Sequence, residues 1–204
     1  MTISITPCTA VTISTADYAT FSNASATDFS ESGITVYKAK VENNVVKMTE
    51  VSNGIVPANT GVILYKDVDE AEDIAVPFTT TNATLSDNEL VATVTRTQVA
   101  KTDGMNFNYI LQSDGEGGIV FNMAAAGGAY MPAGKAYLST TVDASASGSA
   151  RLSVVFADDT EGIAQIENES VKMDGVAYDL QGRRVAKPTV KGLYIVNGKK
   201  TLVK

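Results

Sequence analysis

The chain has 204 residues, of which 44% are hydrophobic, and its 23 Asp/Glu outnumber its 16 Lys/Arg to give a net charge of −7 at pH 7. A mean hydropathy of +0.03 without a long apolar run is typical of soluble globular chains and argues against a membrane-spanning segment. Because the chain has no histidine and one cysteine, Ser-His-Asp and Cys-His nucleophile systems, histidine-ligated metals, an intrachain disulfide and multi-cysteine zinc sites are excluded.

Short runs of β-branched and aromatic residues, separated by Asn, Asp, Gly, Ser and Pro, predict an all-β body. Helical periodicity is hardly sustained anywhere, although a short helical turn near Ala71 is an alternative at that point. The predicted strands in chain order are residues 11–14, 18–22, 34–41, 45–51, 61–65, 90–94, 107–111, 119–123, 136–139 and 152–156. Their spacing is that of a sandwich or barrel, and we predict an antiparallel β-sandwich.

Turns and a faint internal repeat support this interpretation. Asn43 and Asn44 separate two alternating segments, and residues 113–118 (SDGEGG) separate two aromatic ones, as expected for antiparallel neighbours. Residues 55–64 (IVPANTGVIL) are echoed by residues 129–138 (AYMPAGKAYL), allowing a one-residue gap. Both place a Pro-Ala turn before an apolar strand, where a residue that cannot donate to a strand ladder is tolerated. The repeat predicts a body of two sheets.

Charge divides the chain near Glu161. Residues 1–161 carry 8 Lys/Arg against 19 Asp/Glu, a net charge of −11, whereas residues 162–204 carry 8 against 4, a net charge of +4. This asymmetry predicts two domains, a β-sandwich module over residues 1–161 and a small β-hairpin tail over residues 162–204. The body lacks the basic surface that nucleic-acid binding requires, so no nucleic-acid partner is expected.

The tail pattern predicts two hairpins, over residues 176–185 (VAYDLQGRRV) and 192–204 (GLYIVNGKKTLVK), with Asn197-Gly198 supplying positive φ to a tight turn. It resembles the C-terminal sorting domain of type IX secretion cargo. The matching residues are Tyr178, Asp179, Leu180, Gly182, Arg183, Gly192, Tyr194, Ile195, Val196 and Lys199. The resemblance implies recognition by that export machinery. Two alternatives are a reduced relative that no longer directs export, because the tail is short, and an ordinary hairpin pair that completes the sheet of the body.

Most of residues 11–157 carry a second resemblance, through Tyr18-Ala-Thr-Phe21 and the two Pro-Ala segments. They resemble a recurrent module that precedes such tails in large secreted surface proteins of Gram-negative bacteria. The resemblance implies a β-sandwich accessory module that is extracellular or on the outer cell surface, and it supplies no binding residues. Because no signal peptide follows Met1, we expect the natural chain to begin upstream of Met1.

Several local patterns resemble phosphate, calcium or reactive-thiol sites, but solvent-exposed loops and packing residues explain them better. Residues 128–135 (GAYMPAGK) lack the spacing and the Ser/Thr of a phosphate loop, so Lys135 is expected to point to solvent. Residues 67–73 (DVDEAED) and 114–118 (DGEGG) offer oxygens to calcium but lack the EF-hand pattern, and solvated loops are expected. Cys8 has no cationic neighbour in sequence, so we expect a packing residue and not a reactive thiol.

The function predicted from these observations is non-enzymatic, with no cofactor and no metal. We expect an accessory or adhesion module at the C-terminal end of a larger protein, whose partners are the export machinery and host or neighbouring surface proteins or glycans. A carbohydrate-binding module is the alternative, since tyrosine rings can stack on sugar faces, although strand aromatics equally suit a core. The candidate ligand-facing residues are Tyr65, Tyr109, Tyr130 and Tyr137. A carboxylate pair for glycoside cleavage also stays open, because separation in space is invisible in a sequence.

Overall fold

The computed structural model describes residues 7–81, 83–115, 118–148 and 150–157 of the body, and residues 177–178, 184–185, 192–196 and 199–203 of the tail. The chain divides into two compact units, Met1–Gly162 and Ile163–Lys204. Within the described ranges the regular elements are strands, apart from one short 3-10 turn at Ala144–Ser147. The prediction of an all-β chain is therefore confirmed. In this described part, no helix is long and apolar enough to cross a membrane.

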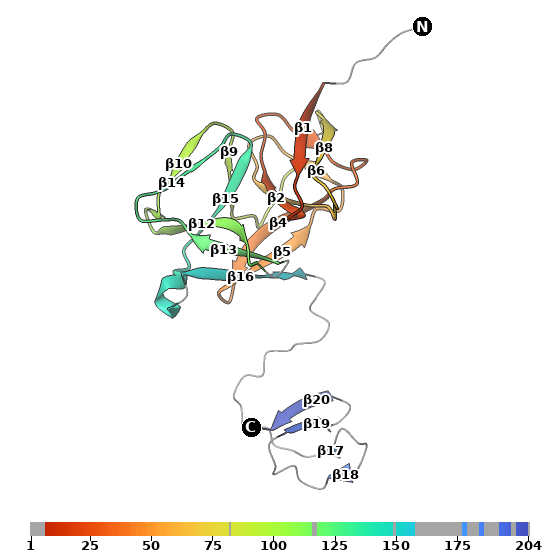
Figure 1. The fold of residues 1–204 in the computed structure, drawn as a ribbon, viewed down its shortest axis with the longest axis vertical. Helices are drawn as coiled ribbons and strands as arrows, with labels where there is room; N and C mark the ends of the chain where they lie inside the picture. Colours follow the sequence, from red (N-terminus) through yellow and green to blue (C-terminus); the bar gives the residue numbers. More distant parts are fainter. Residues whose placement is uncertain are drawn as a thin grey trace. The chain divides into compact units, whose positions relative to one another are not determined.

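The main sheet of the body has ten strands in the order β2-β7-β4-β5-β16-β13-β12-β15-β9, with β11 paired on β12 (Figure 1). Their bounds are β2 Tyr18–Phe21, β4 Thr35–Glu42, β5 Val45–Glu50, β7 Val62–Tyr65, β9 Leu90–Thr93, β11 Thr102–Asp103, β12 Asn106–Ser113, β13 Ile119–Met123, β15 Lys135–Thr140 and β16 Arg151–Phe156. Neighbours are antiparallel except β5 and β16, which pair in parallel. The ten strands predicted from sequence all lie in this sheet or in β1, Cys8–Ile13.

The two ends of the sheet approach each other, so the sheet is nearly closed. The backbone N–H of Ser22, just after edge strand β2, donates to Gly134 O beside β15 at 3.0 Å. At the other edge, the N–H of Glu89 before β9 donates to Ala39 O of β4 at 2.7 Å. The finer prediction of a two-sheet sandwich stays a prediction, because the pairing follows one curved path.

Three two-stranded sheets surround the main sheet, and most of their short strands were not predicted. They are β1 with β8 (Glu72–Pro77), β3 (Thr27–Asp28) with β6 (Ile55–Val56), and β10 (Thr97–Val99) with β14 (Ala129–Met131). The alternative of a helical turn near Ala71 is wrong, because β8 begins at Glu72 and pairs along its length with β1. Asn43 and Asn44 form the β4–β5 turn with φ of 52° and 63°, as a tight hairpin requires.

The order of the main sheet is palindromic around β16. On one side lie β5, β4, β7 and β2, and on the other lie β13, β12, β15 and β9 in the corresponding places. The small sheets match as well, because β6 precedes β7 and pairs with β3, as β14 precedes β15 and pairs with β10. The repeated segments 55–64 and 129–138 are these β6–β7 and β14–β15 units. The body therefore contains two similar halves joined by β16.

The core consists of separate apolar clusters on the two faces of the main sheet. One lies between β2, β7 and β4 and the outer strands β1 and β8, with Phe29, Val36, Leu64 and Val76 among its members. The second lies inside the curved sheet around Met48, Tyr109, Phe121 and Leu138. A third, around Val99 and Met131, lies under β10 and β14. The second cluster ends at a group of partly buried aromatic rings, which form the site described below.

In the tail, four strands pair in the order β18-β17-β19-β20. They are β17 Ala177–Tyr178, β18 Arg184–Val185, β19 Gly192–Val196 and β20 Lys199–Val203, and all their pairs are antiparallel. Asn197-Gly198, the turn predicted between the last two, lies outside the described residues.

Candidate functional site

Strand register brings four aromatic residues to one face of the main sheet. Tyr18 of β2 lies directly opposite Tyr65 of β7, and Tyr65 lies diagonal to Tyr37 of β4, whose direct partner in β7 is Ile63. Phe156, the last residue of β16, pairs with Met48 of β5 on the same face. Side chains two residues apart in a strand lie on the same face of a sheet. The registers of the strand pairs β2–β7, β7–β4, β4–β5 and β5–β16 therefore bring the four aromatic side chains to one face.

The four rings line an open pocket at the end of the second core cluster. The ring centroids of Tyr18 and Tyr65 are 4.7 Å apart, and those of Tyr37 and Phe156 are 5.4 Å apart in an edge-to-face arrangement. The pocket has a volume of about 300 Å3, and its lining is completed by Met48, Glu50 and Ala157. We call this set of residues the aromatic pocket. Its volume is at the lower end of the range for small-ligand sites, about 300–1,000 Å3.

The electrostatics of the aromatic pocket favour a neutral Tyr18 hydroxyl group beside one carboxylate. Burial raises the pKa of the Tyr18 hydroxyl, and the nearby Tyr65, Tyr37 and Asp17 raise it further. The Tyr18 hydroxyl is therefore protonated at neutral pH and can donate a hydrogen bond. Glu50, which is exposed, is the one charged residue among the described lining residues and can accept one.

Ring faces, hydroxyl groups and a carboxylate are the groups that the aromatic pocket offers to a ligand. Glycoside cleavage in most families needs a second carboxyl group within about 10 Å, and the described lining of the aromatic pocket contains only Glu50. Rings offered to a pocket supply apolar contact area while their hydroxyl groups fix orientation. The arrangement can therefore hold a small ligand that has both an apolar face and hydroxyl groups.

The four tyrosines proposed from sequence fall in different places. Tyr65 lines the aromatic pocket. Tyr109 is wrong as a ligand-facing residue, because it is 0% exposed and its Oη donates to Val142 O at 2.7 Å and accepts from the Ala144 N–H at 2.9 Å. Tyr137 packs half-buried against the third core cluster, and burial together with Asp103 raises the pKa of its hydroxyl.

Tyr130 is the most exposed of these tyrosines and lies on β14. Its ring is 61% exposed and is stacked under the guanidinium of Arg96, 4.3 Å from the ring centroid. No second ring contact accompanies it among the described residues, so Tyr130 is a single surface aromatic. Sequence reasoning missed Tyr18 and Tyr37, because only the strand register shows that they share a face with Tyr65.

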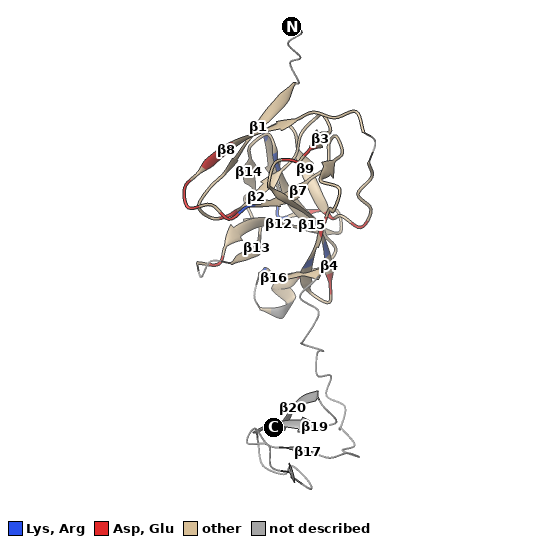
Figure 2. Ribbon diagram, turned by 90° about the vertical axis from the view of Figure 1, so that its right-hand side faces the viewer, with Lys and Arg blue, Asp and Glu red and all other residues tan. Residues whose placement is uncertain are grey.

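The other sequence candidates also have clear positions. Cys8 was expected to be a packing residue, and this is wrong because the thiol is free and exposed on β1. The acidic residues of segment 67–73 are exposed, and those of β8 are visible in Figure 2. Within the described part of the chain, no three acidic or cysteine side chains come together as a metal site. Lys135 is half-buried instead of pointing freely to solvent.

Lys135 belongs to a groove that runs along edge strand β2. Two adjoining cavities, each about 430 Å3, share Thr12, Ala19, Thr20 and Lys135 as lining residues. One is also lined by β1 and the 133–134 turn, and the other by residues 111–113 of β12. We call this feature the β2 groove. It adjoins the aromatic pocket, since Tyr18 lines both.

Part of the sorting-tail motif lies in described strands. Tyr178 is in β17, Gly192, Tyr194, Ile195 and Val196 are in β19, and Lys199 begins β20. Tyr178 pairs with Arg184 of β18 and with Ile195 of β19, so β17 lies between these two strands. Asp179, Leu180, Gly182 and Arg183 lie outside the described residues.

No protein-family model, curated protein or solved structure matches the chain.

Proposed function

We propose that this chain is a non-enzymatic accessory or adhesion module of a secreted or surface-displayed protein, whose body binds a partner through the aromatic pocket. The observation that carries the proposal is the assembly of Tyr18, Tyr37, Tyr65 and Phe156 around an open cavity of about 300 Å3. Half-buried rings that line a cavity leave apolar area for a ligand, whereas core rings such as Tyr109 are fully covered.

A carbohydrate ligand is the second candidate function, and the aromatic pocket favours it over a featureless spacer. Pyranose rings present an apolar face that suits tyrosine and phenylalanine rings, and their hydroxyl groups suit the Tyr18 hydroxyl and the Glu50 carboxylate. We also propose that the body is a two-sheet sandwich, which would offer such a site at the end of its core. The absence of histidine leaves the common hydrolase mechanisms without their base.

A glycan-array screen of the full chain, followed by thermal-shift titration of each hit, tests the ligand proposal. Binding to the folded state raises the melting temperature by mass action. We expect Tyr65→Ala to weaken binding at least about tenfold, equivalent to 1.4 kcal/mol. Tyr130→Ala, which removes an exposed ring outside the aromatic pocket, is the matched control and should leave binding unchanged. A hit that is equally sensitive to both variants would contradict the proposed site.

For the tail, we propose recognition by a type IX export machinery, supported by the ordered motif from Tyr178 to Lys199. Deleting residues 162–204 from the precursor should leave the protein inside the cell envelope. The measurement is surface labelling of intact cells with an antibody against the body. Unchanged surface display after the deletion would refute the sorting role while leaving the binding role of the body untouched.

A further inference from the structure

The two similar halves of the body each leave part of one strand edge without a strand partner. β4 pairs with β7 only through residues 35–37, and β12 pairs with β15 only through residues 107–109. In the described structure, the edges formed by residues 38–42 and 110–113 therefore continue past the end of their neighbouring strand. We call the first the β4 seam and the second the β12 seam. They occupy equivalent places in the palindromic sheet.

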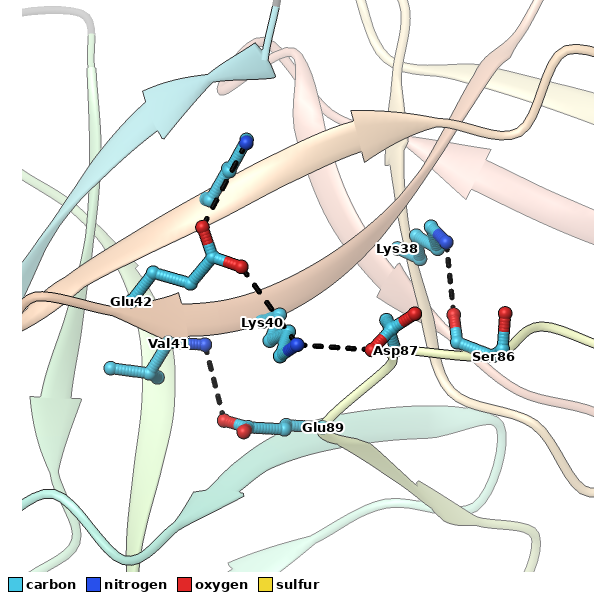
Figure 3. A network of polar contacts seen from close by, with 8 residues as sticks. Lys38, Lys40, Val41, Glu42, Ser86, Asp87 and Glu89 are labelled. Carbon is cyan, nitrogen blue, oxygen red and sulfur yellow. Dashed lines mark hydrogen bonds and ion pairs between the residues drawn. The ribbon is translucent and has the colours of Figure 1, made fainter.

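The β4 seam is covered by a short acidic segment of the chain (Figure 3). Backbone N–H groups of Ala39 and Val41 donate to the side chains of Asn88 and Glu89, each at 3.2 Å. In return, the Glu89 N–H donates to Ala39 O at 2.7 Å. Two lysines complete the contact, because Lys40 Nζ is 3.0 Å from Asp87 Oδ1 and Lys38 Nζ donates to Ser86 O at 2.9 Å. The backbone and carboxylate of Glu89 and the amide oxygen of Asn88 thus satisfy this edge.

The β12 seam carries unpaired backbone groups instead. The Asp114 N–H donates to Gly118 O at 3.0 Å, so these two residues form a hydrogen-bonded pair. Hydrogen-bonded and non-hydrogen-bonded pairs alternate along an antiparallel ladder, and Leu111 and Ser113 fall in the non-hydrogen-bonded pairs of β12 and β13. By this alternation Leu111 and Ser113 direct their N–H and C=O groups away from β13. On β2, the Lys66 N–H donates to Asp17 O, which makes these two residues a hydrogen-bonded pair. By the same alternation, the N–H and C=O groups of Thr20 point away from β7. In the described strand ladders, these three residues have no paired strand on the side to which these backbone groups point.

A cavity and a cation lie where the covering segment would be. Thr20, Leu111 and Ser113 all line the cavity of about 430 Å3 in the β2 groove. Lys135 is the one charged residue in the described lining of either cavity of the groove. Its ammonium group has no ion pair in the described part of the chain, although residues 1–161 carry a net charge of −11. The groove therefore favours an occupant with a backbone edge and a carboxylate.

We propose that the β12 seam binds an extended, acidic polypeptide segment of a partner protein, which adds as a strand along β12 between β12 and β2. The segment would do for β12 what residues 86–89 do for β4, with main-chain hydrogen bonds to Leu111 and Ser113 and a carboxylate beside Lys135. This deepens the proposed adhesion function and rests on it for the source of the strand. It does not involve a ligand in the aromatic pocket.

The test uses a synthetic peptide with the sequence of residues 84–90 (TLSDNEL), the segment that covers the β4 seam. It is titrated into the 15N-labelled full chain, and amide chemical shifts are followed by NMR. We expect saturable shifts centred on Thr20, Leu111 and Ser113. The neutral peptide TLSNNQL should bind about fivefold more weakly to the wild type, as expected for one exposed charge pair. Lys135→Ala should remove this difference between the two peptides.

Two N-methylated peptides separate strand addition from simple charge attraction. Each carries methyl groups on one of the two alternating sets of amides, so that each loses the hydrogen bonds to one side. At least one of them should bind tenfold or more weakly than the parent peptide. Equal binding of all three peptides, shifts centred on the aromatic pocket, or no saturable shift at millimolar peptide would each overturn the proposal. Glycan binding is measured separately, so failure here is distinguishable from failure of the proposed function.

Discussion

Removing the hydroxyl group of Tyr109 should destabilise the body by about 2–3 kcal/mol, because the buried amide of Ala144 would lose the partner that it has among the described residues. The Oη accepts from the Ala144 N–H at 2.9 Å and donates to Val142 O at 2.7 Å. One net hydrogen bond contributes about 0.5–1.5 kcal/mol, and a buried donor without a partner costs about 1–3 kcal/mol. Ala144 is 4% exposed, so water cannot readily replace the hydroxyl group in Tyr109→Phe.

Urea unfolding of the full chain, followed by far-ultraviolet circular dichroism, measures this loss. Tyr130→Phe is the matched control, because Tyr130 is 61% exposed, and its free energy of unfolding should stay within about 0.5 kcal/mol of the wild type. A loss for Tyr109→Phe below about 0.5 kcal/mol would refute the reasoning, since it would mean that the hydroxyl group does not satisfy the 142–144 connection.

Three further changes have definite expected outcomes in the same unfolding assay. Gly61→Ala would place a Cβ atom 2.7 Å from Ala136 Cβ and should lower the free energy of unfolding by about 1–3 kcal/mol. Gly127→Ala is the control, because its added Cβ atom would meet nothing within 4 Å, and equal effects of the two variants would contradict the close packing at Gly61. Asn44→Val puts a β-branched residue at φ of 63° and should cost about 1–2 kcal/mol, and an unchanged unfolding midpoint would argue against this turn. The hydrogen bond from Lys40 lowers the pKa of the Asp87 carboxyl below its usual 3.8. A lowered pKa in the folded state stabilises the protein above pH 3.8 and loses that effect as the pH falls through the folded-state value. Asp87→Asn should therefore differ from the wild type at pH 7 and converge with it as the pH falls below 3.8; a constant difference would contradict the ion pair.

Local features of the fold were predictable because they depend on neighbours in sequence. β-branched and aromatic runs located ten strands of the body, and Asn43-Asn44 located a turn, but the six-residue strand β8, which begins with two acidic residues, was missed. Strands of two or three residues such as β3 and β6 carry too short a pattern to be recognised. The parallel pairing of β5 with β16 joins residues about a hundred positions apart, and no local pattern encodes it.

The candidate site was only partly predictable for the same reason. Tyr65 was identified by its residue type, but its ring partner Tyr18, and Phe156 in contact with Tyr18, come from strands that only the sheet order brings together. Tyr109 was misjudged because an aromatic residue in an alternating strand has the same pattern whether its face is buried or open. The placement of buried Ala144 and partly buried Val142 around its hydroxyl group is a tertiary property.

The central place of β16 has a consequence for the order of folding during synthesis. β5 lies on one side of this strand and β13 on the other, and β16 is the last strand of the body to leave the ribosome. Each half can pair its own hairpins earlier, but the β5 and β13 edges stay unjoined until residues 151–156 have emerged. Completion of the body thus coincides with the appearance of the tail, and a chain that stops before Arg151 would expose the edges of β5 and β13 to other chains.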